Sequence, residues 1–232
     1  MDIKIFYDQK YATFESLPGF QAEREYCIRI IQWMKMMEIW PAVAERYLDA
    51  GCGFGLKTYI FSEYFQHSTG IDFSHNVAEI CKILNNKPDS LEFQITDIEN
   101  LEGVGYDLIT AFGLSYFNIS DMGILAARIE KQVDKLLNRG GVFLITTRTG
   151  PSSNAGTGWH LLNKTEIKVV KHTLRNNLRD CRIDLFEPDK SWTYLRSGKF
   201  LQVSGSVYKT LMNKPRDLFI IIRKDGPDAG IK

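Results

Sequence analysis

Two kinds of apolar segment alternate along the chain from residue 47 onward. Short runs rich in β-branched residues, such as 142–147, are typical of buried strands, whereas residues 23–39 carry large apolar side chains at helical spacing. Asn163 and Glu166 form a predicted capping pair at the start of a later helix. Further helices are predicted at 56–65, 76–84, 122–137 and 200–212, and the last two strands at 182–186 and 218–223. This alternation favours an α/β fold with a parallel sheet and right-handed crossovers.

The run 47–55 carries the most specific signal in the chain. An apolar, strand-like stretch ends in Asp49, and glycines follow at every second position from Gly51 to Gly55. Glycines let the backbone turn sharply and approach a ligand with no Cβ in the way. Open α/β sheets bind ligands at such strand ends. Leucine occupies position 56, so the spacing is Gly-x-Gly-x-Gly, which argues against the Gly-x-Gly-x-x-Gly fingerprint of a dinucleotide pyrophosphate site.

Residues 48–55 resemble motif I of the class I S-adenosylmethionine-dependent methyltransferases of the small-molecule type. Later segments fall where that family has its next four strands, at 70–74, 93–98, 106–113 and 136–147. The resemblance covers about residues 45–150 well. It implies a Rossmann-like, mostly parallel seven-stranded sheet with helices on both faces and the last strand antiparallel.

The same resemblance sets the expected domain organisation. We expect one methyltransferase domain over residues 1–232, with an N-terminal helical or lid segment over 1–45 and a cofactor-binding core over 45–150. Residues 6–12, which include Tyr11, resemble the lead segment that many small-molecule methyltransferases fold over the cofactor. Ordinary packing of an amphipathic helix is the alternative for this segment.

The resemblance implies S-adenosylmethionine as cofactor and S-adenosylhomocysteine as product. Asp72 is expected to accept both ribose hydroxyls, as the acidic residue of dinucleotide folds does. Asp97 is expected at the adenine amino group, although an Asp there also suits a helix N-cap. Asp49 is expected to order the glycine loop and to contact the methionine amino group, directly or through water. The complete predicted cofactor set is Tyr11, Asp49, Gly51, Cys52, Gly53, Gly55, Asp72, Phe73, Ser74, Asp97, Ile98, Phe112, Gly113 and Leu114.

Several members of this set have more specific expected roles. Phe73 is expected to pack on the purine, and residues 112–114 to wall the methionine and the sulfonium. Cys52 is expected to be a small filler in the turn rather than a reactive thiol.

Methyl transfer is an in-line displacement at carbon that gains much from alignment and desolvation. A hydroxyl acceptor usually needs a base, whereas an amine needs only an unprotonated lone pair. His160, after the fifth predicted strand, and Tyr116, after the fourth, are the predicted catalytic residues. Arg148 and Trp159 are the predicted substrate-binding residues. A surface role for His160 stays open as the alternative.

Composition argues against a secreted, membrane-spanning or metal-dependent protein. Residues 1–17 carry acids and polar groups throughout, which argues against a signal peptide, and no apolar run approaches the ~20 residues that span a bilayer. Four scattered cysteines without a Cys-x-x-Cys pair favour reduced thiols in a cytoplasm. No group of His, Asp or Glu has metal-ligand spacing, so we expect a metal-independent reaction.

Charge gives a further hint about the substrate. The net charge of +1 lacks the excess of positive charge that is typical of nucleic-acid-binding proteins. Residues 1–125 hold 9 Lys and Arg against 18 Asp and Glu, while residues 126–232 hold 20 against 10. This asymmetry is either ordinary solvated surface or a cationic half that attracts an anionic substrate.

The leading hypothesis is a methyltransferase that acts on an oxygen or nitrogen of a small molecule. Residues 112–116 contain no Asn-Pro-Pro-Tyr-like motif, so methylation of nucleobase amino groups is not expected. We expect no nucleic-acid or membrane partner, and a monomer or homodimer. Two alternatives stay open: a non-catalytic protein that binds the cofactor or its demethylated product, and an NAD-dependent oxidoreductase.

Overall fold

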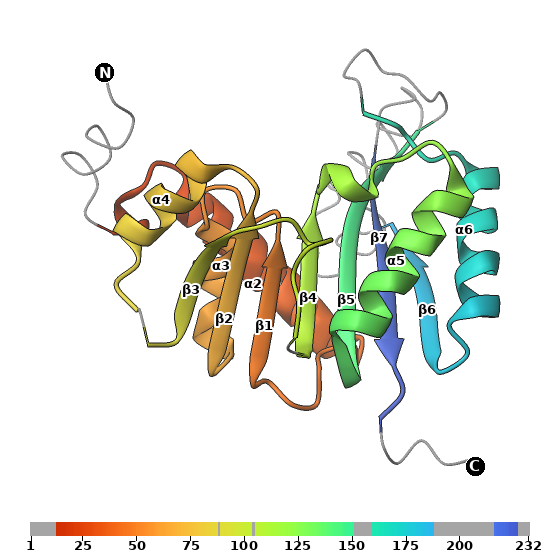
Figure 1. Ribbon diagram of the computed structural model, residues 1–232, viewed down its shortest axis with the longest axis horizontal. Helices are drawn as coiled ribbons and strands as arrows, with labels where there is room; N and C mark the ends of the chain where they lie inside the picture. Colours follow the sequence, from red (N-terminus) through yellow and green to blue (C-terminus); the bar gives the residue numbers. More distant parts are fainter. Residues whose placement is uncertain (1–12, 88, 104, 151–158, 188–215, 227–232) are drawn as a thin grey trace, which may run out of the picture.

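A single seven-stranded sheet organises the computed structural model, which describes residues 13–87, 89–103, 105–150, 159–187 and 216–226 (Figure 1). The strand order is β3-β2-β1-β4-β5-β7-β6. Neighbouring strands pair in parallel, except that β7 is antiparallel to both β5 and β6. The strands are β1 (Arg46–Ala50), β2 (His67–Asp72), β3 (Leu91–Ile95), β4 (Tyr106–Phe112), β5 (Leu137–Thr149), β6 (Cys181–Phe186) and β7 (Arg216–Lys224). The predicted mostly parallel sheet with an antiparallel last strand is confirmed.

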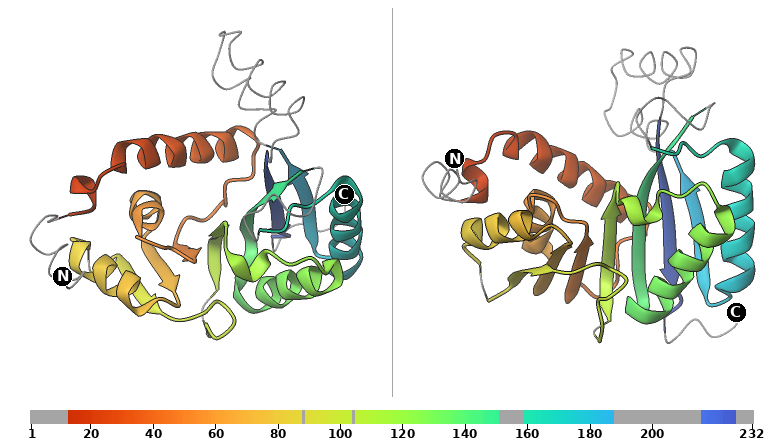
Figure 2. Two further views of the ribbon diagram at one scale, coloured as in Figure 1. Left: turned by 90° about the horizontal axis from the view of Figure 1, so that it is seen from above. Right: turned by 45° about the horizontal axis from the view of Figure 1, so that its top comes forward.

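Helices cover both faces of the sheet, as predicted (Figure 2). Helices α2 (Phe20–Met36), α3 (Leu56–Phe61) and α4 (His75–Leu84) pack on one face, and α5 (Met122–Leu136) and α6 (Lys164–Asn177) on the other. The described residues also form three short 3-10 turns, η1 (Phe14–Ser16), η2 (Ser62–Tyr64) and η3 (Ser115–Phe117). Among the helices that the structure describes, none is long and apolar enough to cross a membrane.

The helix expected at 23–39 lies about one turn earlier, because a tertiary contact decides its start and a local turn decides its end. It begins at Phe20, whose ring is buried against Tyr59 at a centroid distance of 6.3 Å. It ends at Met36, because Glu38 adopts a left-handed φ of 55° and the next two N–H groups turn back to the Met34 carbonyl.

The other helix predictions differ less from the structure. The run 56–65 divides into α3 and η2. The predicted capping box at the start of α6 is confirmed, since Asn163 accepts from Glu166 N–H at 3.1 Å and Glu166 accepts from Asn163 N–H at 2.8 Å. The helix predicted at 200–212 lies outside the described residues.

Side chains alternate between two separate cores along each strand. On β1, Tyr47 contributes to the core under α2, α3 and α4, whereas Leu48 and Ala50 contribute to the core under α5 and α6. Continuous burial on both faces is expected of a parallel sheet whose crossover helices cover it. The carboxyl ends of β1, β2, β4 and β5 are therefore the exposed edge at which a ligand can bind.

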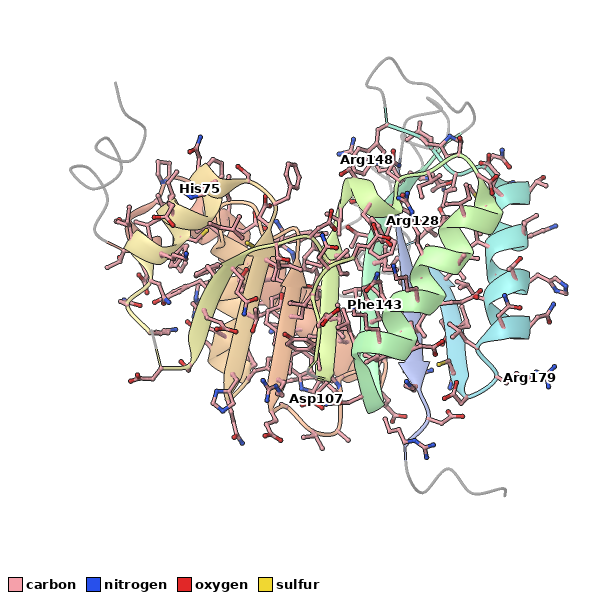
Figure 3. All side chains as sticks on the ribbon, viewed as in Figure 1. His75, Asp107, Arg128, Phe143, Arg148 and Arg179 are labelled. Atoms are coloured by element: carbon pink, nitrogen blue, oxygen red, sulfur yellow. The ribbon has the colours of Figure 1, made fainter. Side chains whose placement is uncertain are left out.

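At the opposite edge of the sheet, Asp107 ties three strands together (Figure 3). One of its carboxylate oxygens accepts from the N–H groups of Glu45 at 3.0 Å and Arg46 at 2.9 Å, and the other accepts from the Asn138 side chain at 2.8 Å. The side chain is only 6% exposed. This one carboxylate therefore holds the start of β1 against β4 and β5.

Replacing Asp107 tests this connection. The Asp107→Ala variant should lose about 2–4 kcal/mol of unfolding free energy, because it leaves two backbone N–H groups and one amide without their acceptor. Urea unfolding monitored by circular dichroism measures the change, with the exposed Asp134→Ala as matched control. A loss no larger than that of the control would contradict this account of Asp107.

Candidate functional site

Two pockets open at the carboxyl edge of the sheet. The first, which we call the β2–β3 pocket, has a volume of about 400 Å³. The second, the β4–β5 pocket, has a volume of about 540 Å³. The β2–β3 pocket is lined by Gly51, Ile71, Asp72, Phe73, Thr96, Asp97, Ile98, Leu114, Ser115, Tyr116 and Arg128. The β4–β5 pocket is lined by Glu23, Tyr26, Lys57, Phe112, Gly113, Thr146, Thr147, Arg148, Trp159 and Asp217.

Asp72 connects the glycine loop with the end of β2 in the β2–β3 pocket. One of its oxygens accepts from Gly53 N–H at 3.1 Å, and the other accepts from Ser74 N–H at 2.9 Å. Each carboxylate oxygen has two lone-pair sites, so each keeps one for a ligand. Asp72 can therefore order the loop and accept two hydroxyl groups at once.

The glycine loop needs the absence of side chains at two positions. Gly51 has a φ of 75°, and a Cβ there would lie 2.6 Å from Cδ1 of Leu114. Gly55 has a φ of 73°, and a Cβ there would lie 2.9 Å from Phe93 and from the Cys81 sulfur. The loop thus lies between Leu114, just after β4, and the buried core under α4, and its Gly51 lines the pocket.

The far side of the same pocket combines a flat apolar surface with an acid. The ring of Phe73 is 74% exposed at the pocket rim and offers a face for stacking. Asp97 accepts from Glu99 N–H at 3.2 Å in a turn rather than at the start of a helix, so the N-cap alternative does not apply. Ile98 is buried beside it.

Asp49 lies beneath the glycine loop and lines neither pocket. Its carboxylate accepts from the hydroxyls of Thr58 at 2.7 Å and Thr110 at 3.1 Å, and Thr110 is 2.7 Å from the Tyr47 hydroxyl. Burial raises the pKa of Asp49, against the lowering effects of both threonines and of Lys57. The predicted ordering of the loop fits this geometry, while contact with a methionine amino group stays a prediction.

The cysteine of the loop packs against a second cysteine. Cys52 and Cys81 both direct their sulfur atoms toward the Gly53 carbonyl, at 3.6 and 3.4 Å. The Cys81 thiol and burial raise the pKa of Cys52, so Cys52 is a protonated thiol at neutral pH. This environment suits the expected role as a small filler.

The β4–β5 pocket brings both predicted substrate-binding residues together. Arg148 lies at the end of β5 (Figure 3). It shares the pocket with Trp159 and with Phe112 and Gly113 from the end of β4. Gly113 N–H donates to the Thr146 hydroxyl at 2.9 Å, which fixes the backbone at this strand end. Aromatic walls and a cation therefore face one cavity.

The two predicted catalytic residues do not meet. Tyr116 lines the β2–β3 pocket, with the Arg128 guanidinium 4.5 Å above its ring and Gln132 3.4 Å from its hydroxyl. His160 lines neither pocket: its Nε2 is 3.2 Å from a Glu166 oxygen, and its backbone is paired on both sides with the Asn118 side chain. A catalytic role for either residue stays a prediction.

Ten lining residues were not predicted from the sequence, and four of them lie on α-helices. Glu23 and Tyr26 come from α2, Lys57 from α3, and Arg128 from α5. Lys57 lies two residues after the glycine motif, and this position in the sequence could have identified it as a site residue. The other three reach the pockets only through helix packing. Tyr11 lies outside the described residues.

Within the described ranges, no group of three or more His, Cys, Asp or Glu side chains is arranged to hold a metal ion. The metal-independent reaction stays a prediction.

The sequence matches the model of a methyltransferase domain over residues 42–185, which is more than half of the chain. The chain belongs to this methyltransferase family. The resemblance to class I S-adenosylmethionine-dependent methyltransferases is thus confirmed, and with it the methyl donor and the enzyme class. A comparison with curated proteins finds no match.

Solved structures share the fold of this methyltransferase at low sequence identity. An S-adenosylmethionine-dependent methyltransferase from Clostridium acetobutylicum has a TM-score of 0.61 at 16% identity, over 96% of this chain and 97% of its own. Geranyl diphosphate C-methyltransferase from Streptomyces coelicolor, solved with S-adenosyl-L-homocysteine, has a TM-score of 0.58 at 12% identity, over 88% and 77%. Phosphoethanolamine N-methyltransferase 2 from Haemonchus contortus, solved with S-adenosyl-L-methionine, has a TM-score of 0.52 at 18% identity, over 79% of this chain and 49% of its own.

The raised pKa of Asp49 predicts a pH dependence of folding stability. A carboxyl whose native pKa is raised binds its proton more readily in the folded state, so wild-type stability should fall as pH rises from about 3.9 to that native pKa. Asp49→Asn should abolish this slope, which is at most about 1.4 kcal/mol per pH unit.

Urea unfolding of both proteins between about pH 4 and pH 8 measures the difference. The unfolding free energy of wild type minus that of the variant should fall until the pH reaches the native pKa of Asp49 and should then become constant. A difference that is constant across this range would contradict a raised pKa at Asp49.

Proposed function

We propose that the chain transfers the methyl group of S-adenosylmethionine to an oxygen or nitrogen atom of a small-molecule acceptor. The observation that carries this proposal is Asp72, whose two oxygens already hold Gly53 and Ser74 and still face the β2–β3 pocket. A carboxylate at this strand end suits a ribose diol, because both hydroxyls then have an acceptor.

The residues of the β2–β3 pocket fit the adenosine part of the donor. Its volume of about 400 Å³ is within the range of small-molecule sites. In this proposal Asp72 binds the ribose hydroxyls, Asp97 and the Ile98 N–H bind the adenine edge, and Phe73 stacks on the purine. The backbone of Gly51 leaves room for close approach of the ligand.

The β4–β5 pocket is the proposed acceptor site. Gly113 lines this pocket and the next residue, Leu114, lines the other, so the two cavities lie on either side of one short segment. When bound, the cofactor supplies an electrophilic methyl group on its sulfonium. Phe112 and Trp159 would exclude water from the reaction, and the pocket walls would hold the acceptor atom in line with that methyl group.

Arg148 gives the acceptor a proposed chemical character. Its side chain is exposed at the end of β5 and lines the β4–β5 pocket, where a guanidinium can bind a carboxylate or phosphate by two hydrogen bonds. We therefore propose an acceptor with an anionic group. We also propose that the enzyme is cytoplasmic and is a monomer or a homodimer. The near-neutral net charge makes a nucleic acid an unsuitable acceptor.

Binding of S-adenosylhomocysteine tests the donor site. Wild type should bind it with micromolar affinity and should not bind NAD in the same calorimetric titration. Asp72→Ala should weaken binding at least about 100-fold, because two charged hydrogen bonds to the ribose are lost.

The exposed Asp134→Ala serves as matched control and should bind like wild type. Preference for NAD, or unchanged binding in Asp72→Ala, would overturn the proposed donor site. Turnover of any acceptor with radiolabelled S-adenosylmethionine would exclude the alternative of a non-catalytic binding protein.

Arg148→Gln tests the acceptor site separately. With an anionic acceptor found by screening, the variant should raise the acceptor KM about tenfold or more, since a charged hydrogen bond is lost. Its affinity for S-adenosylhomocysteine should change by less than about twofold. Arg139→Gln, at an exposed position away from the pockets, is the control. An unchanged KM would refute the role of Arg148.

A further inference from the structure

An ion pair between two helices forms part of the wall of the β4–β5 pocket. The Lys57 Nζ on α3 lies 2.8 Å from a Glu23 oxygen on α2. The two side chains are 30% and 28% exposed, and both line the pocket. The pair is therefore partly withdrawn from solvent, yet it faces a cavity that can admit a ligand.

Lys57 also lies close to the place where the two proposed ligand sites meet. It follows the glycine loop by two residues, and its Nζ is 5.6 Å from the centroid of the Phe112 ring at the end of β4. The next residue, Thr58, donates its hydroxyl to the buried Asp49. Packing beneath the loop thus fixes the backbone that carries Lys57.

The charges around Lys57 keep it fully cationic. Burial alone would lower the pKa of Lys57, but the hydrogen bond and charge of Glu23, together with the charge of Asp49, raise it above its ordinary value. A cation and an anion therefore stand side by side in the wall, each with one strong partner and with exposed surface for a second.

An α-amino acid group is complementary to such a pair. It carries a carboxylate and an ammonium on one carbon atom, so it can lie against the pair with its charges reversed. Each of the four charges then has two opposite neighbours, which compensates for the water that each loses.

We propose that Lys57 and Glu23 bind the amino-acid end of the methyl donor, with Lys57 on the carboxylate and Glu23 on the ammonium. Glu23 then takes the place first expected for Asp49, which lines neither pocket. This inference rests on the proposed function. It extends the donor site from the β2–β3 pocket across residues 113 and 114 into the β4–β5 pocket. It leaves Arg148, on β5, to the acceptor.

The binding of two nucleosides distinguishes a ligand-binding role of the ion pair from a purely structural link between α2 and α3. S-adenosylhomocysteine carries the amino-acid end, whereas 5′-methylthioadenosine keeps the adenosine and lacks that end. Wild type should bind the first at least about tenfold more tightly. Lys57→Met should weaken binding of S-adenosylhomocysteine about 10- to 100-fold and change that of 5′-methylthioadenosine less than about twofold. Calorimetric titration measures all four affinities.

Lys82 offers a matched control, because it pairs with Glu79 at 3.3 Å on the surface of α4 and neither residue lines either pocket. Lys82→Met should leave both affinities unchanged. If Lys57→Met weakens the binding of both nucleosides equally, the ion pair only links the two helices. This inference then fails, while the proposed donor site in the β2–β3 pocket stands. If wild type binds neither nucleoside, the proposed function fails and this inference fails with it.

A third ligand tests which of the two side chains binds the ammonium and which binds the carboxylate. Decarboxylated S-adenosylhomocysteine keeps the ammonium, so Glu23→Gln should weaken its binding and Lys57→Met should not. The reverse pattern would overturn the assignment. If Lys57→Met does not fold, Glu23→Gln and the charge-retaining Lys57→Arg decide the question through the same ratio of nucleoside affinities. A ratio equal to that of wild type in Glu23→Gln would then refute the proposal.

Discussion

The burial of the Asp49 carboxylate beneath the glycine loop is the constraint on which the site depends. A carboxylate that leaves water without partners costs several kcal/mol, and Asp49 is only 1% exposed. Its partners come from two other elements, Thr58 on α3 and Thr110 on β4, with the Tyr47 hydroxyl behind Thr110. This chain of hydroxyl groups holds the start of α3 against the centre of the sheet. The backbone between positions 49 and 58 must therefore complete its turn within a few residues, and that turn lines the β2–β3 pocket.

The two pockets have different chemistry because different elements line them. In the β2–β3 pocket the end of β2 and the turn after β3 contribute the acids Asp72 and Asp97, which suit the hydroxyl and amino groups of a nucleoside. Around the β4–β5 pocket α2 and α3 add the pair of Glu23 and Lys57. A ligand that spans both pockets would thus meet hydrogen-bond acceptors at one end and paired charges at the other. Such an arrangement fits a molecule that is a nucleoside at one end and an amino acid at the other.

Local patterns predicted the elements better than their ends. The capping box of α6 was correct because Asn163 and Glu166 interact within one turn and need no other part of the chain. The start of α2 was displaced because Phe20 packs on Tyr59, which is distant in sequence, whereas its end is set by the left-handed backbone of Glu38. Asp107 was overlooked for the same reason: its three donors lie at least 31 residues away, and no local spacing marks such a bond.

The sequence by itself determined the class of fold, the position of the glycine loop and the acids at the strand ends. These features depend on the alternation of strand-like and helix-like segments, on the glycine spacing and on the residues that follow each predicted strand, all of which are local in the sequence. Only the tertiary structure decided which side chains meet. It placed Asp49 in the core, separated Tyr116 from His160, and brought Glu23 to Lys57 across two helices. The physical reason is that these contacts depend on how helices pack on a twisted sheet, and packing is set by many weak contacts at once rather than by any one motif.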